Sequence, residues 1–273
     1  MKTSNPPDLN SLVAAVKESK KYRDMNLPDA FLADLARQAS LTAGKPHEIH
    51  AVFRKMLHNV IAPYLEDIDY KDEIARLENS PSILSDLPNY CLEIMRRHAS
   101  TRERIPYLEK FFNTIFLEIG APKSVLDLAC ALDPLCLPWI RLAEEATFTA
   151  YDVNGSRISY LQCLFELTFP FAEAIQQDIF VQPPAQHADC AFFFKEAHRL
   201  EKRQPGATAR LIKALDVGVV VLSLPAMDLT RHHSLESYHT QLVEKAVRSS
   251  NKTCKKIKVE DEILFFIREG ASR

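Results

Sequence analysis

The first 105 residues place apolar side chains three and four positions apart, and no stretch there alternates apolar with polar residues. This spacing puts the apolar side chains on one face of a helix. Helices are therefore predicted at Leu9–Tyr22, from Pro28 onward, and at Pro46–Ile61, Lys71–Leu77 and Leu87–His98. We interpret residues 1–105 as an all-helical module.

The pattern changes at Pro106, where short apolar runs begin to alternate with helical segments. Strands are predicted at Ser124–Leu128, Thr147–Tyr151, Ala172–Gln176, Asp189–Phe194, Gly218–Ser223, Cys254–Val259 and Glu262–Arg268. Helices are predicted at Tyr107–Ile119, Pro134–Glu144, Ser156–Leu167, Glu196–Glu201, Ala207–Leu215 and Leu235–Ser249. This alternation is typical of an α/β fold whose mostly parallel sheet is covered on both faces.

The last two predicted strands are separated only by Glu260 and Asp261. A tight, charged turn of this kind indicates a β-hairpin, so the final strand should run antiparallel to its neighbours. Seven strands with one antiparallel member are typical of the class I, Rossmann-like methyltransferases. Residues 106–273 are accordingly predicted to form an S-adenosylmethionine (SAM)-dependent methyltransferase domain.

The segment that joins the first two strands of this sheet carries the first sign of a cofactor. A turn of small residues, Ala129–Ala131, follows the first strand, and Asp152 ends the second strand twenty-one positions past Ala131. An acidic residue in that place typically binds the ribose hydroxyls of a nucleotide in doubly wound α/β folds. The turn lacks the G-x-G-x-x-G pattern that brings a backbone close to a pyrophosphate. Adenosine without pyrophosphate favours SAM over NAD.

Composition excludes several other classes of protein. The 273 residues are 47% hydrophobic and 26% charged, with a formal net charge of -2 and no apolar run of membrane-spanning length. The N-terminus does not resemble a secretory signal. Six cysteines lie scattered without a C-x-x-C pair, which predicts reduced thiols in the cytoplasm and neither a disulfide nor a metal site.

Lysine and arginine are concentrated in three stretches, at residues 17–23, 96–104 and 248–258. A single run of this kind is usually a solvated surface. Three runs in one chain make a polyanion such as RNA a partner to consider, although the sequence does not place them on one surface.

Several short strings, in this order and at these distances, resemble one known family. They are Ser19–Arg23, Arg54–His58 followed by Pro63–Tyr64, His98–Arg104, Asp127–Pro134, Gln177–Ile179, Phe194–Lys195 and Ser223–Pro225. Together they are similar to the acquired aminoglycoside-resistance 16S rRNA methyltransferases of the Arm/Rmt family, the 16S rRNA (guanine(1405)-N(7))-methyltransferases. The similarity covers nearly the whole chain.

The chain also departs from that family. Asp133 stands where the family usually has Asn, and Ala131 stands where Gly is frequent. Met227 replaces an arginine, and Thr230–His233 replaces a Gly-rich basic segment. These departures bear on binding of the target rather than on use of the cofactor.

The resemblance implies a cofactor site. The residues expected to bind SAM are Arg104, Ala129, Cys130, Ala131, Asp152, Asp178 and Ile179. Asp178 resembles the acid that meets the adenine amino group, and Arg104 resembles the arginine that pairs with the methionine carboxylate, which a guanidinium fork matches in two parallel bonds. Asp133 is expected either to contact the cofactor's amino group or to cap the helix predicted after it.

The substrate side of the site is predicted from position and charge. Lys195 follows the fourth strand, at the rim where substrates meet this kind of sheet, and would either hold an rRNA phosphate or orient the guanine. Contacts with rRNA are expected from Lys20, Lys21, Arg23, Arg199 and Arg231. Cys130 is not expected to act as a nucleophile because no base supports it, and His58 and His98 are expected to be structural.

The predicted activity is methyl transfer from SAM to guanine N7 in the decoding-site helix of 16S rRNA, which would confer aminoglycoside resistance. The expected substrate is the assembled 30S subunit and not DNA, and the expected enzyme is a cytoplasmic monomer. Two alternatives remain at this point: a small-molecule methyltransferase, and a non-catalytic rRNA-binding protein on the same fold.

Overall fold

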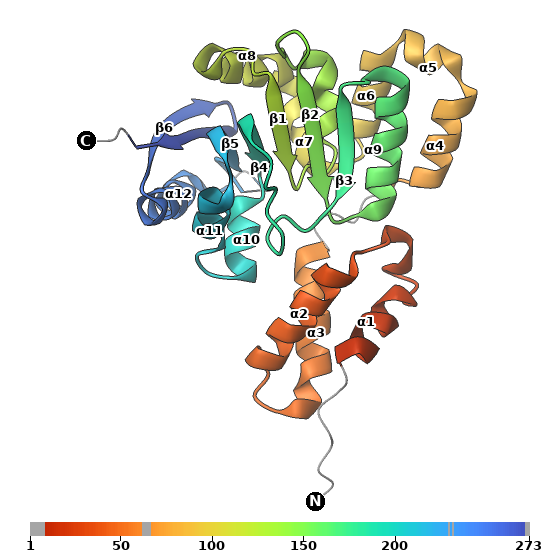
Figure 1. Cartoon of the computed structure of the whole chain (residues 1–273), viewed down its shortest axis with the longest axis vertical. Helices are drawn as coiled ribbons and strands as arrows, with labels where there is room; N and C mark the ends of the chain where they lie inside the picture. The colour runs from red at the N-terminus through yellow and green to blue at the C-terminus, as the bar shows by residue number, and fades with distance from the viewer. Residues whose placement is uncertain (1–8, 62–66, 229, 231, 271–273) are drawn as a thin grey trace, which may run out of the picture.

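A seven-stranded sheet with the order β3-β2-β1-β4-β5-β7-β6 organises the molecule (Figure 1). The computed structural model describes residues 9–61, 67–228, 230 and 232–270. The strands are β1 (Ser124–Leu128), β2 (Thr147–Asp152), β3 (Ala172–Gln176), β4 (Ala188–Phe194), β5 (Val217–Pro225), β6 (Lys252–Val259) and β7 (Glu262–Glu269). The pairs among β1 to β5 are parallel, and β7 is antiparallel to both β5 and β6. The predicted class I fold and its closing hairpin are confirmed.

Helices cover both faces of this sheet. One face packs against α4 (Tyr70–Asn79), α6 (Leu87–Met95), α8 (Leu108–Ile119) and α9 (Gly155–Thr168). The other face packs against α10 (Ala197–Arg203), α11 (Ala207–Ala214) and α12 (Glu236–Ser250). Successive side chains of a strand point to opposite faces, so Phe192 and Phe194 enter the first core and Phe193 enters the second. These apolar runs form strands because both of their faces are buried.

Three N-terminal helices form a separate core beyond the carboxyl ends of the strands (Figure 1). They are α1 (Leu9–Lys17), α2 (Asp29–Thr42) and α3 (Ile49–Ile61), with 3₁₀ turns at Arg23–Met25 and Pro46–Glu48. Helices α4 and α6 share a core with the sheet instead. The hydrophobic cores therefore divide between Ile61 and Tyr70, and the division at residue 105 stays a prediction about which part of the chain binds rRNA.

Two short helices complete the described N-terminal half, α5 (Pro81–Ser85) and α7 (Ala99–Arg104), with a 3₁₀ turn at Ile105–Tyr107. The hydroxyl of Thr101 donates to the carbonyl of Met95 at 2.8 Å, which ties the start of α7 to the end of α6. Across the described ranges, no helix has the length and apolar character needed to span a bilayer.

The helix predicted at Pro134–Glu144 is wrong. The chain forms a 3₁₀ helix at Asp133–Trp139 and continues without a helix to the start of β2. Pro134 suits a first helical turn, but Pro138 follows four positions later and has no N–H to donate. The role of Asp133 as a cap for an α-helix at that place is lost with it.

Candidate functional site

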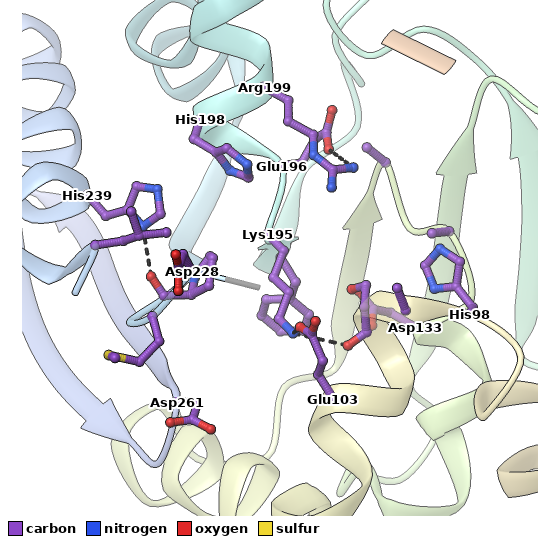
Figure 2. A pocket seen from close by; sticks show the side chains of 18 of the residues that line it. His98, Glu103, Asp133, Lys195, Glu196, His198, Arg199, Asp228, His239 and Asp261 are labelled. Atoms are coloured by element: carbon purple, nitrogen blue, oxygen red, sulfur yellow. Dashed lines mark hydrogen bonds and ion pairs between the residues drawn. The ribbon is translucent and has the colours of Figure 1, made fainter. Parts of the chain in front are cut away.

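Two cavities lie at the carboxyl ends of the strands and share Ala129 and Glu196 in their walls. The larger one has a volume of about 580 Å³, and the smaller one about 60 Å³. Figure 2 shows the larger cavity, with Glu103 and Asp133 on one side and His198 and His239 on the other. Ligands of open α/β sheets bind at this edge, so the two cavities are the candidate site.

The backbone at the mouth of the site is held in an unusual conformation. Ala129, Ala131 and Lys195 have φ angles of 52°, 46° and 56°, in the left-handed region. Each costs roughly 1–2 kcal/mol for a residue with a Cβ. The amide of Lys195 donates to the carbonyl of Ser223 at 2.8 Å, which holds that turn in place. The left-handed angle at Ala131 gives a physical reason for the glycine that the Arm/Rmt proteins often have there.

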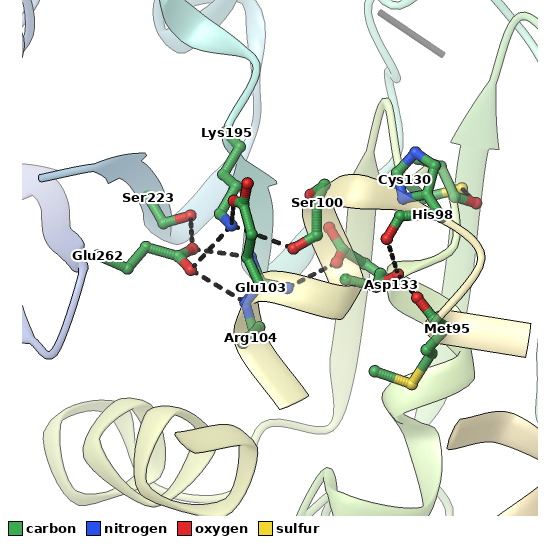
Figure 3. Close-up of polar contacts among 12 residues, drawn as sticks. Met95, His98, Ser100, Glu103, Arg104, Cys130, Asp133, Lys195, Ser223 and Glu262 are labelled. Atoms are coloured by element: carbon green, nitrogen blue, oxygen red, sulfur yellow. Dashed lines mark hydrogen bonds and ion pairs between the residues drawn. The ribbon is translucent and has the colours of Figure 1, made fainter. Parts of the chain in front are cut away.

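A buried network of charges lies behind the larger cavity (Figure 3). Arg104 has no exposed surface and donates from Nε and Nη2 to Glu262, at 3.2 and 2.7 Å, and from Nη1 to Asp133 at 2.6 Å. The Nζ of Lys195 lies 2.9 Å from Glu103 and 3.6 Å from Glu262. Asp133 and Lys195 line the cavity, whereas Arg104 stands one layer deeper.

The network sets the protonation of its members. Burial opposes the charge of Glu262, but Arg104 and Lys195 outweigh it and lower the pKa of Glu262 to about 2. For Asp133, burial outweighs the attraction of Arg104 and raises the pKa. Glu262 is thus the fixed anion that holds Arg104 and Lys195 in position.

The structure places Asp152 where the sequence predicted it, at the end of β2 and in the wall of the smaller cavity. Its carboxylate accepts from the amides of Asn154 (2.7 Å) and Ala131 (3.0 Å) and from Arg157 Nη1 (2.9 Å). Asn154 caps α9 by accepting from the amide of Arg157. Asp152 is therefore a fixed carboxylate at the cavity, paired with a buried arginine.

Asp178 lies in the wall of the same cavity, together with Ile179. Its Oδ1 accepts from the amides of Phe180 (2.9 Å) and Val181 (3.4 Å). Its Oδ2 is buried and lies 2.8 Å from Arg203 Nη2 in an ion pair, but it has no hydrogen-bond partner among the described residues. An acceptor left in this state suits a donor on a ligand, such as the amino group of adenine, so these residues fit the predicted cofactor.

The N-terminal helices form part of the smaller cavity. Met25, Phe31, Val60 and Ile61 line it opposite Asp152 and Asp178. All four belong to the separate N-terminal core or pack against it. Helices α2 and α3 and the 3₁₀ turn at Arg23–Met25 thus complete the part of the site that would hold adenosine.

The other predicted chemical groups are accounted for by burial. Burial raises the pKa of the Cys130 thiol well above its usual range, and burial lowers the pKa of His98 to about 3. His58 is exposed, and its Nδ1 accepts from Lys21 Nζ at 3.1 Å. Within the described ranges, no group of three or more His, Cys, Asp or Glu side chains is placed to hold a metal ion.

The predicted rRNA contacts lie in two places. Lys20, Lys21 and Arg23 are exposed on the N-terminal helical part, and Arg199 lines the larger cavity. Arg231 lies outside the described residues. The lysines of the third basic stretch lie on β6, where Lys255 contacts Glu118 and Lys256 contacts Glu236. That stretch is therefore a paired surface and not a free basic patch.

Sequence reasoning missed three residues of the site: Glu262, Arg157 and Arg203. Glu262 was read only as the start of a strand, yet it is a fully buried acid inside the apolar run of β7. Arg157 follows Asp152 by five positions, in the first turns of α9, which is the local signal that was available. Arg203 lies at the end of α10 among charged residues, yet its side chain is only 7% exposed.

The sheet order, the antiparallel β7 and the fixed acids at the ends of β2 and β3 define a class I methyltransferase. The family model of the ribosomal RNA methyltransferases (FmrO) matches residues 18–267. The chain belongs to this family, and the predicted enzyme class is confirmed.

Known relatives and structures agree with the family. The 16S rRNA (guanine(1405)-N(7))-methyltransferase of Frankia casuarinae is 28% identical over 247 residues, which are 85% of this chain and 84% of the relative. The enzyme of the same name from Serratia marcescens is 26% identical over 96% of this chain and 99% of its own.

Among solved structures, the 16S rRNA methyltransferase RmtF in complex with S-adenosyl-L-homocysteine (SAH) has a TM-score of 0.78 at 21% identity, covering 98% of this chain and all of RmtF. The 16S rRNA methylase RmtB has a TM-score of 0.76 at 22% identity, covering 97% of this chain and all of RmtB. These two structures share the fold.

Proposed function

We propose that this protein transfers a methyl group from SAM to N7 of a guanine in the decoding-site helix of 16S rRNA, and so confers aminoglycoside resistance. The observation that carries the proposal is the rRNA methyltransferase family match over residues 18–267, which includes helices α2 and α3 as well as nearly all of the sheet. The relatives from Frankia and Serratia that bear this activity in their names span nearly the same length.

The proposed cofactor site joins both cavities. Asp152 would accept from the ribose hydroxyls and Asp178 from the adenine amino group, while Ile179 adds an apolar wall. The backbone of Ala129–Ala131 would border the methionine end. A direct bond from Arg104 to the methionine carboxylate stays a prediction, since Arg104 already holds Asp133 and Glu262. The geometry favours a positioning role for Arg104, through Asp133 at the cavity wall.

The chemistry asks little of the protein beyond positioning. When bound, SAM supplies a methyl carbon activated by its sulfonium. Guanine N7 has an in-plane lone pair at neutral pH, so no residue has to remove a proton. Catalysis would then come mostly from holding the base and excluding water. This fits a site whose buried His98 stays neutral and whose Cys130 stays protonated. Lys195, fixed by Glu103 and Glu262, would orient the base.

The larger cavity supports a flipped base as the substrate. Its volume of about 580 Å³ falls within the usual range for small-ligand sites, roughly 300–1,000 Å³. Extracting the guanine from its stack would cost a few kcal/mol, offset by contacts in the cavity. Lys20, Lys21, Arg23 and Arg199 would contribute phosphate contacts, with Arg231 proposed alongside them.

The test is to incubate the protein with purified 30S subunits and labelled SAM, and then to map the methyl group by borohydride and aniline cleavage. We expect cleavage at one guanine of the decoding-site helix, and much less label on naked 16S rRNA. Label on an adenine, or no label, would contradict the proposal. Binding to the 30S subunit without methylation would favour the non-catalytic rRNA-binding protein. Methylation of small molecules alone would favour the small-molecule methyltransferase.

Asp152→Asn is the matched negative control. Asparagine keeps one of the two carboxylate oxygens, which accept separately from the amides of Ala131 and Asn154, and removes the charge that the ribose hydroxyls would use. We expect SAH affinity measured by calorimetry to fall roughly 10- to 100-fold, with the circular dichroism spectrum unchanged.

The proposed partner is the 30S subunit rather than DNA, and the proposed active form is a monomer. Ribosomal subunits place the reaction in the cytoplasm.

A further inference from the structure

Arg203, the last residue of α10, lies at the adenine end of the proposed site. Its Nη2 donates to Asp34 of α2 at 2.8 Å and lies 2.8 Å from Asp178 Oδ2. Its guanidinium lies over the rings of Phe180 and Phe31, with 4.8 and 5.3 Å to the ring centroids. The side chain is therefore fixed by two carboxylates and two rings, and it lines the smaller cavity.

Two polar atoms in this arrangement remain without a hydrogen bond. Among the described residues, neither Asp178 Oδ2 nor Arg203 Nε has a hydrogen-bond partner, and both atoms are buried. The ion pair brings Arg203 Nη2 close to Asp178 Oδ2, but a hydrogen bond is not formed there. Buried polar groups in native proteins are almost always satisfied, so an acceptor and a donor left side by side at a cavity indicate a ligand with the complementary pair.

The edge of adenine carries that complementary pair. Its 6-amino group is a donor, and a ring nitrogen that accepts lies on either side of it, N1 on one side and N7 on the other. We propose that Arg203 is a specificity-determining residue that donates its Nε–H to one of these ring nitrogens while Asp178 Oδ2 accepts from the amino group. The inference rests on the proposed function, because it deepens the assignment of the adenine end.

Asp34 gives the N-terminal helices a part in this recognition. Its side chain is 10% exposed, and it accepts from Arg203 Nη2 across the boundary between the N-terminal core and the sheet. Asp34 is therefore a positioning residue: it fixes the plane of the guanidinium, and hence the direction of Nε–H. Lysine at position 203 could keep the charge but not this planar donor geometry.

The test measures dissociation constants by calorimetry for three ligands: SAH, the 1-deaza analogue of SAH, which lacks N1, and the 7-deaza analogue of SAH, which lacks N7; both analogues keep the 6-amino group. The wild-type protein should prefer SAH over the analogue altered at the contacted nitrogen by roughly 10- to 100-fold. In Arg203→Lys and Arg203→Met this preference should fall to within about threefold. Loss of discrimination against the 1-deaza analogue identifies N1, and loss against the 7-deaza analogue identifies N7.

The ratio of two affinities distinguishes a loss of base recognition from a structural defect, because a structural defect weakens the binding of all three ligands alike. Arg210→Met is the matched control: this exposed arginine also lies over the Phe180 ring, at 5.4 Å, and has no contact with Asp178. It should keep the wild-type ratios. Asp34→Asn, which retains Arg203, should lower the same ratio less than Arg203→Met does.

Unchanged ratios for both analogues in the Arg203 variants, with SAH still bound, would overturn the inference and leave the proposed function intact. A wild-type protein that binds no SAH and methylates no 30S subunit would instead remove the proposed function itself.

Discussion

Charged side chains are used in opposite ways in the N-terminal helices and at the carboxyl edge of the sheet. In the first region Lys20, Lys21 and Arg23 keep their charges in solvent. At the sheet edge Arg104 and Glu262 have no exposed surface and contact each other. Exposed cations contribute little to stability but can bind a polyanion, whereas buried pairs fix a geometry and become costly when one partner is lost.

The contrast distinguishes charged residues that fix the geometry of the site from charged residues that could bind rRNA, which the sequence alone does not distinguish. The basic runs of the sequence look alike, yet Arg104 is a core residue and Lys20 is a surface residue. We expect substitutions in the buried network to act first on folding and the shape of the site. Substitutions on the N-terminal helices should act first on rRNA binding.

Glu262→Gln should have the largest effect. It removes the charge that Arg104 and Lys195 share and leaves two buried cations undercompensated. Breaking such a network typically costs about 3–5 kcal/mol, to be measured by urea unfolding. Glu260→Gln, two positions earlier in the same hairpin and paired with Lys110 at the surface, should leave the midpoint unchanged. Equal midpoints for the two variants would show that the buried network does not stabilise the fold.

Acid should destabilise the sheet region in two stages. The pKa values of His98 and His198 are lowered to about 3 by burial, so below pH 6.5 only the unfolded chain gains these protons. Stability should therefore fall from pH 6.5 toward 3, by up to about 1.4 kcal/mol per pH unit for each histidine. Glu262, with a pKa of about 2, adds a further loss below pH 4.5 as its unfolded form takes up a proton.

Urea unfolding at pH 7.5, 6.0 and 5.0 measures the first stage. The double variant His98→Gln/His198→Gln should show a shallower decline across that range than the wild type. A decline of the same steepness in both proteins would exclude the two histidines as its cause.

Lys20→Ala/Lys21→Ala should leave the fold intact and weaken binding to 30S subunits. The slope of log affinity against log salt should fall by roughly 1.5 to 2, and the thermal midpoint should shift by less than about 2 °C. The comparison variant is Lys255→Ala/Lys256→Ala on β6, whose lysines already contact glutamates. We expect it to retain the wild-type salt slope, and equal losses in the two variants would contradict a specific role for the N-terminal lysines.

Ala131→Gly should have the smallest effect. Glycine removes the strain of the left-handed angle at this position, roughly 1–2 kcal/mol, and loses roughly 0.4–1 kcal/mol through the entropy of the unfolded chain. A net gain between zero and about 1.6 kcal/mol is expected by urea unfolding. Ala150→Gly, in the buried strand β2, should instead destabilise by about 1 kcal/mol. Destabilisation by both changes would show that the turn is not strained.

The fold was largely predictable because the strands are buried on both faces. Val219–Leu222 and Phe192–Phe194 are continuous apolar runs that no surface helix would carry. The failure at Pro134–Glu144 has a local cause, the second proline at position 138, which outweighed the expectation of a helix after the first strand.

The site was predictable only where position along a strand determines function. Asp152 and Asp178 were found because each follows a strand of the sheet. Glu262 contacts Arg104 across 158 positions of the chain, and Arg203 contacts Asp34 across 169. Contacts between residues so far apart in the sequence arise from the tertiary fold, and no local sequence pattern predicts them.

Met25, Phe31, Val60 and Ile61 form a roof over the smaller cavity, and this roof has a bearing on how the enzyme would cycle. The N-terminal helical part that is proposed to bind the ribosome also covers the adenosine. In the bound enzyme, the cofactor could therefore neither leave the smaller cavity nor enter it. We therefore expect one methylation for each binding event. The product SAH would be exchanged for SAM only after the enzyme has dissociated from the 30S subunit.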